Sequence, residues 1–225
     1  MILCLVTDRR RLVPSGAHER DAVRCLLAQT RHAAAAGVDL IQVRERDLDG
    51  AALGALVMAI VDSVRSTRVR VVVNDRLDVA VACGAHGVHL RADSMSISAA
   101  RQLAPPSFLI GRSVHGVDEA TAASGADYLI AGTVFRSASK PDDHALLGID
   151  GLRAVVRAAK APVLAIGGVT TEHLAAVSAA GAAGVAAIGL FMDRGRLSAA
   201  PCRARELGAI VARARSLFDS VNSHP

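Results

Sequence analysis

Eight short runs rich in Val, Ile and Leu recur along the chain, and longer Ala-rich stretches separate most of them. Short apolar runs of this kind, several preceded by Gly or Gly-Ala, are typical of buried strands, and the longer stretches predict helices. The predicted strands cover residues 2–7, 40–43, 69–73, 87–90, 108–113, 128–131, 163–166 and 185–188. The predicted helices include residues 49–64, 117–124, 150–159 and 171–180.

Strands that alternate with helices pair in parallel, through right-handed crossover connections. A count of eight favours a closed barrel over an open doubly wound sheet, which commonly has about five or six strands. The length of 225 residues suits one such barrel, a class of roughly 250 residues. No linker or low-complexity tract divides the sequence. We therefore expect an α/β protein in which residues 1–225 form a single (β/α)8 TIM-barrel domain, with the segment after Pro201 as its eighth helix.

The composition excludes some classes of partner. The chain has four Phe, one Tyr and no Trp, so its core must consist of aliphatic residues, as barrel interiors usually do. The formal net charge is +5, but the basic residues are interleaved with Asp and Glu, and no basic run is combined with aromatic residues that could stack on bases. We expect no nucleic-acid partner, and we interpret the basic surface as typical of an enzyme with anionic substrates.

Cysteine spacing and hydropathy indicate the compartment. Cys4, Cys25, Cys83 and Cys202 lie far apart with no C-x-x-C pair, so we expect buried thiols in a reducing environment. No stretch approaches the roughly 18 uncharged apolar residues of a membrane span, and the apolar start at residues 1–7 is too short for a secretory signal. The sequence predicts a cytoplasmic protein with no membrane partner.

Polar residues gather where the predicted strands end, which is where TIM barrels carry their active sites. They include Gln42, Arg44, Arg46, Asn74, Asp75, Asp93, Ser113, His115, Ser137, Ser139 and Lys140. Structural roles are also open: the arginines can pair with nearby acids, Asn74-Asp75 can form a turn and helix cap, and His115 can be a satisfied buried histidine. The gathering of all these residues on one face favours a catalytic or binding site.

Lys140 is one of only two lysines among 26 basic residues. An ammonium group is a compact charge that rotates freely, unlike the planar guanidinium group. The presence of Lys140 in an Arg-rich chain suggests that its position requires an ammonium group. The alternative is that the lysine was retained by chance.

Glycines at the last two strands indicate a phosphate site. Gly167 and Gly168 follow the seventh strand, and Ile188 and Gly189 end the eighth. Backbone N–H groups at such glycines approach phosphate oxygens closely, and a helix that begins near Thr170 adds a favourable dipole.

Several ordered motifs between about Thr7 and Phe191 resemble the thiamine phosphate synthase/TenI superfamily. The matching stretches are IQVRER, VVVNDRLDVA, GAHGVHL, IGRSVH, GADYLIAGTVF, SASKPDD, APVLAIGGVT and GAAGVAAIG. The resemblance implies a TIM-barrel enzyme of thiamine biosynthesis with one of two activities. Synthases join hydroxymethylpyrimidine diphosphate to a thiazole phosphate and release diphosphate. TenI-type thiazole tautomerases aromatise a thiazole carboxylate phosphate by moving a proton.

The resemblance implies that substrate and phosphate groups are bound by residues at the strand ends. We assign this role to Gln42, Asn74, Ser113, Ser137, Ser139, Lys140, Gly167, Gly168, Ile188 and Gly189. A synthase would also bind Mg²⁺, for which Asp75 and Asp93 are the candidate ligands.

Three departures from the synthase pattern weigh against that activity. Arg46 stands where synthases usually have Lys, and Ser137-Ala138-Ser139-Lys140 replaces T-x-T-K. The stretch Arg91-Ala92-Asp93-Ser94 replaces Gly-Gln-x-Asp, so Ser94 stands at the second Mg²⁺-ligand position and Asp93 lies one residue early. Since Mg²⁺ prefers carboxylates in octahedral geometry, this change weakens the expected metal site.

Three stretches are closer to TenI proteins, namely Arg44-Glu45-Arg46, HLRADSM and IGRSVH. His115 stands at the position of the tautomerase histidine, a residue type suited to moving a proton near neutral pH. Arg44 and Arg46 would stabilise the substrate carboxylate or the developing charge, with no cofactor required. We therefore predict a thiazole tautomerase, with the synthase as the alternative and a non-catalytic thiamine-phosphate binder as a third hypothesis. The expected partners are a small phosphorylated thiazole, a pyrimidine diphosphate if the chain is a synthase, and further copies of the chain in a homo-oligomer.

Overall fold

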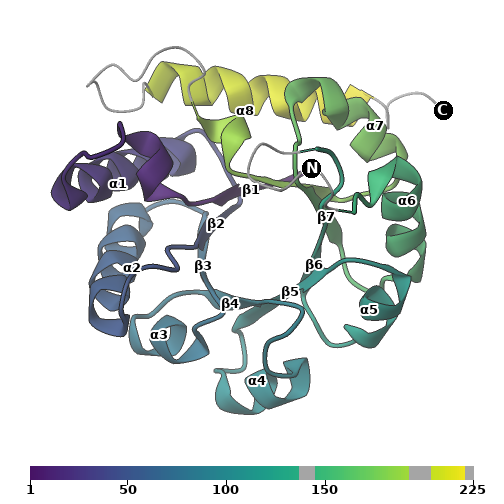
Figure 1. The fold of residues 1–225 in the computed structure, drawn as a ribbon, viewed down its shortest axis with the longest axis horizontal. Coiled ribbons are helices and arrows are strands. Elements are labelled where there is room, and N and C mark those ends of the chain that lie inside the picture. Colours follow the sequence, from purple (N-terminus) through teal and green to yellow (C-terminus); the bar gives the residue numbers. More distant parts are fainter. Residues whose placement is uncertain (137–144, 193–203, 221–225) are drawn as a thin grey trace.

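Eight parallel strands close a barrel in which each strand is hydrogen-bonded to the next and β1 to β8 (Figure 1). The computed structural model describes residues 1–136, 145–192 and 204–220. The strands are β1 (Ile2–Val6), β2 (Leu40–Val43), β3 (Arg70–Asn74), β4 (Gly87–Leu90), β5 (Leu109–Val114), β6 (Tyr128–Ala131), β7 (Val163–Ile166) and β8 (Gly184–Ala187). The predicted (β/α)8 TIM barrel is therefore confirmed.

Helices form the layer outside the barrel (Figure 1). The α-helices are α1 (Glu19–Ala35), α2 (Gly50–Val64), α3 (Leu77–Ala82), α4 (Ile97–Leu103), α5 (Val117–Ala122), α6 (Gly148–Ala158), α7 (Leu174–Ala179) and α8 (Ala204–Asp219). Short 3₁₀ helices are η1 (Arg9–Leu12), η2 (Thr171–His173) and η3 (Gly189–Phe191). In the described ranges, none of the helices is long and apolar enough to cross a membrane.

The strand ends differ from the predicted ones by one residue at four strands. β3 extends to Asn74, because Asn74 pairs with His89 of β4. β8 begins at Gly184, because Gly184 pairs with Ile2 on one side and Leu164 on the other. A run of apolar residues does not show which residue finds a partner in the neighbouring strand, so these ends depend on the tertiary structure.

Side chains of the strands alternate between two apolar cores. Leu3 and Leu5 belong to the larger core between strands and helices. Cys4 and Val6 belong to a second core inside the barrel, together with Leu40, Tyr128, Ile130, Leu164 and Ala186. The barrel is therefore filled by side chains, as is usual for this fold.

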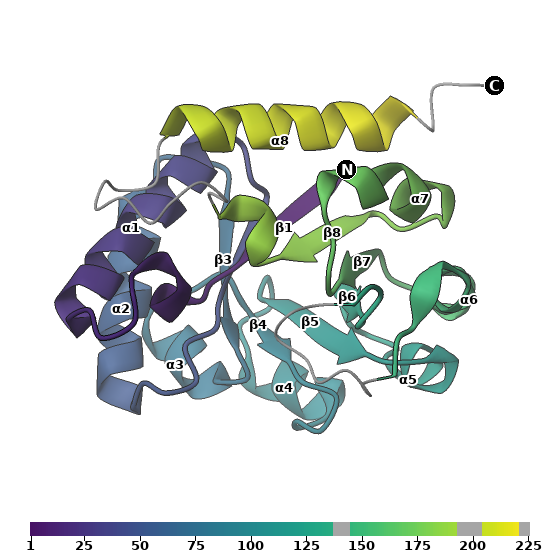
Figure 2. The same cartoon turned by 45° about the horizontal axis from the view of Figure 1, so that its top comes forward.

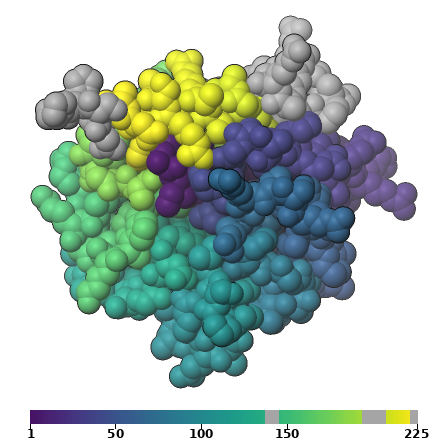
Figure 3. Space-filling model, turned by 180° about the vertical axis from the view of Figure 1, so that it is seen from behind, coloured from purple at the N-terminus to yellow at the C-terminus, as the bar shows by residue number. Residues whose placement is uncertain are grey.

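The last helix closes the layer around the barrel. α8 packs against α1 and α7 (Figure 2) and lies beside the first residues of the chain (Figure 3). The Arg215 guanidinium donates hydrogen bonds to the carbonyl oxygens of Met1 at 2.7 Å and Gly37 at 2.6 Å, and to the Asp39 carboxylate at 2.9 Å. The predicted closing role of the segment after Pro201 agrees with this packing.

Barrel closure generates a testable prediction at Gly184. A Cβ atom at this position would lie 1.9 Å from the carbonyl oxygen of Ile2, so an alanine would separate β1 from β8. We expect Gly184→Ala to lower the free energy of unfolding by about 3 kcal/mol, measured by urea unfolding. The matched control is Gly208→Ala in α8, where a Cβ would meet none of the described atoms outside the helix's own backbone within 4 Å. This control should be stabilising by about 0.5–1 kcal/mol, because alanine favours the helix. An equal response of the two variants would contradict the packing argument.

Candidate active site

A buried amide, Gln42, and a partly buried one, Asn74, lie where β2 and β3 end. The Gln42 side-chain N–H group donates to the Asn74 side-chain oxygen at 3.0 Å, and Gln42 is only 3% exposed. Within the described residues, the Gln42 Oε1 atom has no hydrogen-bond partner. Because a buried polar atom without a partner is costly, this oxygen is suited to accept a hydrogen bond from a ligand.

Asp75 is the first residue of the loop after β3 and has an unusual backbone conformation. Its φ is +64°, a left-handed conformation that Asp tolerates better than most residues, and its N–H group donates to the His89 carbonyl oxygen at 2.9 Å. Asp75 Oδ1 is buried and has no partner in the described part of the chain. Asp75 Oδ2 lies 3.6 Å from Arg91 Nη1.

Arg91 also contacts Asp93, so both predicted metal ligands meet one guanidinium group. A cavity of about 220 Å³ lies here, lined by residues that include Arg46, Asn74, Asp75 and Arg91. Asp75 and Asp93 therefore both contact Arg91, whose positive charge lies between them. Their role as metal ligands stays a prediction. Arg91 was noted in the sequence only as a departure from a motif.

Arg44 and Arg46 follow β2 and concentrate positive charge at this rim. Arg44 is half-buried and Arg46 is exposed. Burial and the neighbouring charge of Arg46 lower the pKa of the Arg44 guanidinium. Among the described residues, neither guanidinium has a hydrogen bond or an ion pair. The suggestion that these arginines pair with nearby acids therefore finds no support in the described ranges.

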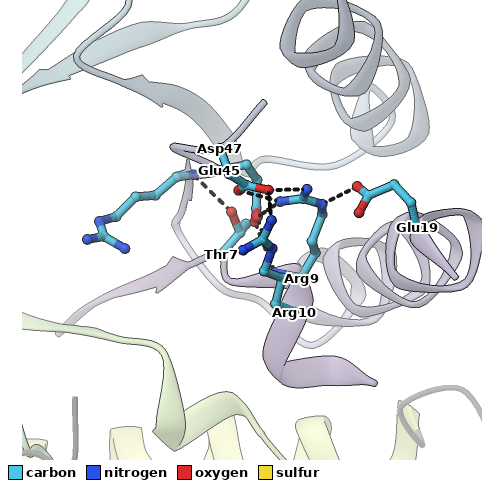
Figure 4. A network of polar contacts seen from close by, with 7 residues as sticks. Thr7, Arg9, Arg10, Glu19, Glu45 and Asp47 are labelled. Carbon is cyan, nitrogen blue, oxygen red and sulfur yellow. Dashed lines mark hydrogen bonds and ion pairs between the residues drawn. The ribbon is translucent and has the colours of Figure 1, made fainter. Parts of the chain in front are cut away.

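An ion cluster around the buried Arg9 and Glu45 supports the backbone that carries these arginines (Figure 4). Arg9, in η1, is 2% exposed and contacts Glu19, Glu45 and Asp47. Burial raises the pKa of the Glu45 carboxyl, although its hydrogen bonds with Thr7 and Arg9 oppose that shift. Sequence reasoning missed this cluster. The available signal was an arginine just after the first strand facing two acids just after the second.

A buried histidine connects two strands inside the barrel. His89 Nε2 lies 2.9 Å from Ser113 Oγ, and His89 Nδ1 lies 3.3 Å from the Tyr128 hydroxyl oxygen. Burial lowers the pKa of His89 to about 3, so the imidazole is neutral at physiological pH. A neutral ring can hold the Ser113 hydroxyl, one of the predicted substrate-binding groups, in a single orientation.

His115 lies in the loop after β5 and is exposed, so the alternative of a satisfied buried histidine is wrong. Its Nδ1 atom lies 3.1 Å from Glu119 Oε2, and its backbone N–H group donates to the same oxygen at 2.8 Å. The side chain therefore reaches a local partner at the start of α5.

Close packing explains the glycine pair after β7. Gly167 and Gly168 have φ values of +98° and +63°. A Cβ atom would lie 2.4 Å from Thr133 Cγ2 at the first position and 2.2 Å from the Arg136 carbonyl oxygen at the second. The Gly168 N–H group donates no hydrogen bond within the described residues. The loops after β6 and β7 therefore lie in contact, with a backbone donor available between them.

The remaining phosphate candidates divide into two groups. Ile188 follows β8 and packs at the edge of the inner core, and Gly189 is the first residue of η3. Ser137, Ser139 and Lys140 lie outside the described residues.

Comparisons with known proteins agree on one family. The model of the family described as "Thiamine monophosphate synthase" matches residues 4–191. The thiamine-phosphate synthase of Methanoculleus marisnigri is 42% identical over 188 residues, which are 83% of this chain and 88% of the relative. That of Moorella thermoacetica is 39% identical over 194 residues, 85% and 91% of the two chains.

A solved structure is similar over nearly the whole chain. Thiamine phosphate pyrophosphorylase from Pyrococcus furiosus has a TM-score of 0.78 and 30% identity, and the match covers 98% of this chain and 96% of that protein. A 3-hexulose-6-phosphate synthase, at 21% identity and a TM-score of 0.65, shares the fold.

These relatives correct the predicted activity. The prediction of a TenI-type thiazole tautomerase, an isomerase, is wrong, because relatives about 40% identical over most of their length are thiamine-phosphate synthases. The prediction relied on short stretches around Arg46, Asp93 and His115, whereas the similarity to synthases extends along the chain. By sequence and by fold, the chain belongs to the thiamine monophosphate synthase family.

Proposed function

We propose that the protein is a thiamine-phosphate synthase, which joins hydroxymethylpyrimidine diphosphate to a thiazole phosphate and releases diphosphate. The observation that carries this proposal is the 42% identity to a synthase over 88% of that enzyme. The rim of the barrel supports it, because a buried amide oxygen, a buried carboxylate oxygen and two arginines without partners in the described part of the chain gather at neighbouring strand ends.

The arginines after β2 would stabilise the departing diphosphate. Arg44 and Arg46 place two positive charges near each other at the rim, and burial around Arg44 strengthens its attraction for an anion. The family resemblance adds Lys140 with the hydroxyls of Ser137 and Ser139 to the same diphosphate. Gln42, fixed by Asn74, would accept a hydrogen bond from the pyrimidine.

The thiazole phosphate would bind where β7 and β8 end. The Gly168 N–H group and the first N–H group of η3, at Gly189, are backbone donors of the kind that bind phosphate oxygens. The Ser113 hydroxyl, oriented by His89, would contact the substrate between the two anionic groups. Because the role of His115 rested on the tautomerase, it has no place in this mechanism.

The carboxylates after β3 and β4 fit a divalent cation. Asp75 Oδ1 is buried without a partner among the described residues, whereas Asp75 Oδ2 and Asp93 pair with Arg91, which a bound cation would displace. Mg²⁺ is commonly bound by one or two carboxylates together with substrate phosphates, so these two residues suffice. We propose that Asp75 and Asp93 hold Mg²⁺, which when bound would neutralise charge on the diphosphate.

The first experiment tests the reaction itself. The purified protein is mixed with both substrates and Mg²⁺, and thiamine phosphate is measured by chromatography. We expect product and diphosphate in equal amounts, and loss of both with excess EDTA. Absence of thiamine phosphate at saturating concentrations of both substrates and Mg²⁺ would overturn the proposal.

The second experiment tests Asp75. We expect Asp75→Asn to lower kcat by roughly 100-fold, because it removes a carboxylate that would hold Mg²⁺ beside the diphosphate. The matched control is Asp78→Asn, which removes an acid of the same segment that is paired with Arg76 on the surface. The control should retain kcat within about twofold. Equal losses in the two variants would contradict the role of Asp75.

A further inference from the structure

Arg9 lies beneath the arginines of the rim and is almost completely buried. Its Nη1 atom donates to Glu45 Oε2 at 2.9 Å and to Asp47 Oδ1 at 2.8 Å, and its Nε atom donates to Glu19. Its backbone N–H group donates to Glu45 Oε1 at 3.1 Å. Figure 4 shows the guanidinium group of Arg9 between the carboxylates of Glu45 and Asp47 and that of Glu19. One side chain thus joins the loop after β1, the loop after β2 and the start of α1.

Stability alone is a weak explanation for such a cluster. Removing charges from water is costly, and buried ion pairs can often be replaced by apolar residues without loss of stability. A buried ion pair does, however, fix the geometry of the backbone that carries it. The segment that Arg9 fixes is the one that carries Arg44 and Arg46 on either side of Glu45.

Residues 44–47 are held at three points by residues 7–10. The Arg44 N–H group donates to Thr7 Oγ1 at 2.9 Å. Glu45 accepts from both the backbone and the side chain of Arg9. Asp47 accepts from Arg9 and pairs with Arg10 at 2.7 Å. The loop after β2 therefore cannot move without breaking several charge-assisted hydrogen bonds.

The arginines of the rim need such support, because they repel one another. The charges of Arg46 and Arg91 both act against the charged form of Arg44. Without a substrate anion between them, these like charges favour an open arrangement of the loop. A rigid anchor keeps them in place before the anion arrives, and pre-organised charge is what makes electrostatic stabilisation effective.

We propose that Arg9 is a positioning residue, which acts through Glu45 to hold Arg44 and Arg46 ready for the diphosphate group. The proposal rests on the proposed synthase function and names a residue that touches no substrate.

The test is a double-mutant cycle. The measured quantity is the affinity of the full-length chain for inorganic pyrophosphate in the presence of Mg²⁺, determined by calorimetry. We expect Arg9→Gln to weaken pyrophosphate binding about 10-fold in the otherwise unchanged protein. In the Arg44→Gln/Arg46→Gln background, the same change should have less than about a twofold effect, because the groups through which Arg9 acts are gone. Arg9→Lys should recover part of the affinity, since one ammonium group keeps the charge but not all three carboxylate contacts.

The matched control is Arg24→Gln, which removes another ion-paired arginine from the neighbouring helix α1, where it contacts Asp21 on the surface. It should leave pyrophosphate binding unchanged. All measurements are made well below the melting temperature of each variant. If Arg9→Gln does not fold, Glu45→Gln replaces it, because the amide keeps the shape of the side chain and an acceptor for the Arg9 N–H group. We expect Glu45→Gln to cause a smaller loss of pyrophosphate affinity in the same cycle.

Two results would overturn the proposal. One is that Arg9→Gln lowers the melting temperature but leaves two quantities within twofold of their original values, namely the affinity for pyrophosphate and the KM for the pyrimidine diphosphate. The other is an equal loss of affinity with and without Arg44 and Arg46. Pyrophosphate binding can be measured without turnover. If the proposed synthase function is wrong, the activity assay of the unaltered chain shows it. If the proposed role of Arg9 is wrong, only the mutant cycle shows it.

Discussion

The hydrogen-bonded ladder between β1 and β8 is the contact on which the site depends, because it closes the sheet. Closure requires Gly184 to lie against the backbone of Ile2, where a Cβ atom has no room. Once the barrel is closed, the C-terminal ends of all eight strands face one rim. Residues far apart in sequence, such as Gln42 and Gly168, then belong to the same surface.

The side chains inside the barrel change from apolar to polar toward the C-terminal ends of the strands. Apolar side chains such as Cys4 and Leu164 fill the inner core, and polar groups lie near the C-terminal strand ends, where Gln42, Asn74 and His89 are hydrogen-bonded to neighbours. Burial keeps His89 neutral and leaves an oxygen of Gln42 without a partner in the described ranges. The site therefore combines a rigid apolar base with polar groups that are oriented in advance.

Much of the fold could be predicted from the sequence, because the strand count and the parallel order agree with the structure. The candidate site residues stay predictions, although Asp75 and Asp93 both contact Arg91. The choice of activity did not, because local motifs around Asp93 and His115 were given more weight than similarity along the whole chain. Three predicted phosphate ligands, Ser137, Ser139 and Lys140, lie outside the described residues and stay predictions.

The alternation of strands and helices follows from the amino-acid sequence alone, since the apolar periodicity of each element is a local property. The same holds for the glycines after β7, whose residue type already indicates an unusual backbone. The burial of Arg9, its contact with Glu45 36 residues away, and the position of Arg91 between two carboxylates were decided only by the tertiary structure. From sequence alone, a charged side chain is expected to lie on the surface, because charged residues are seldom buried. Only the packing of distant segments determines whether water is excluded from it.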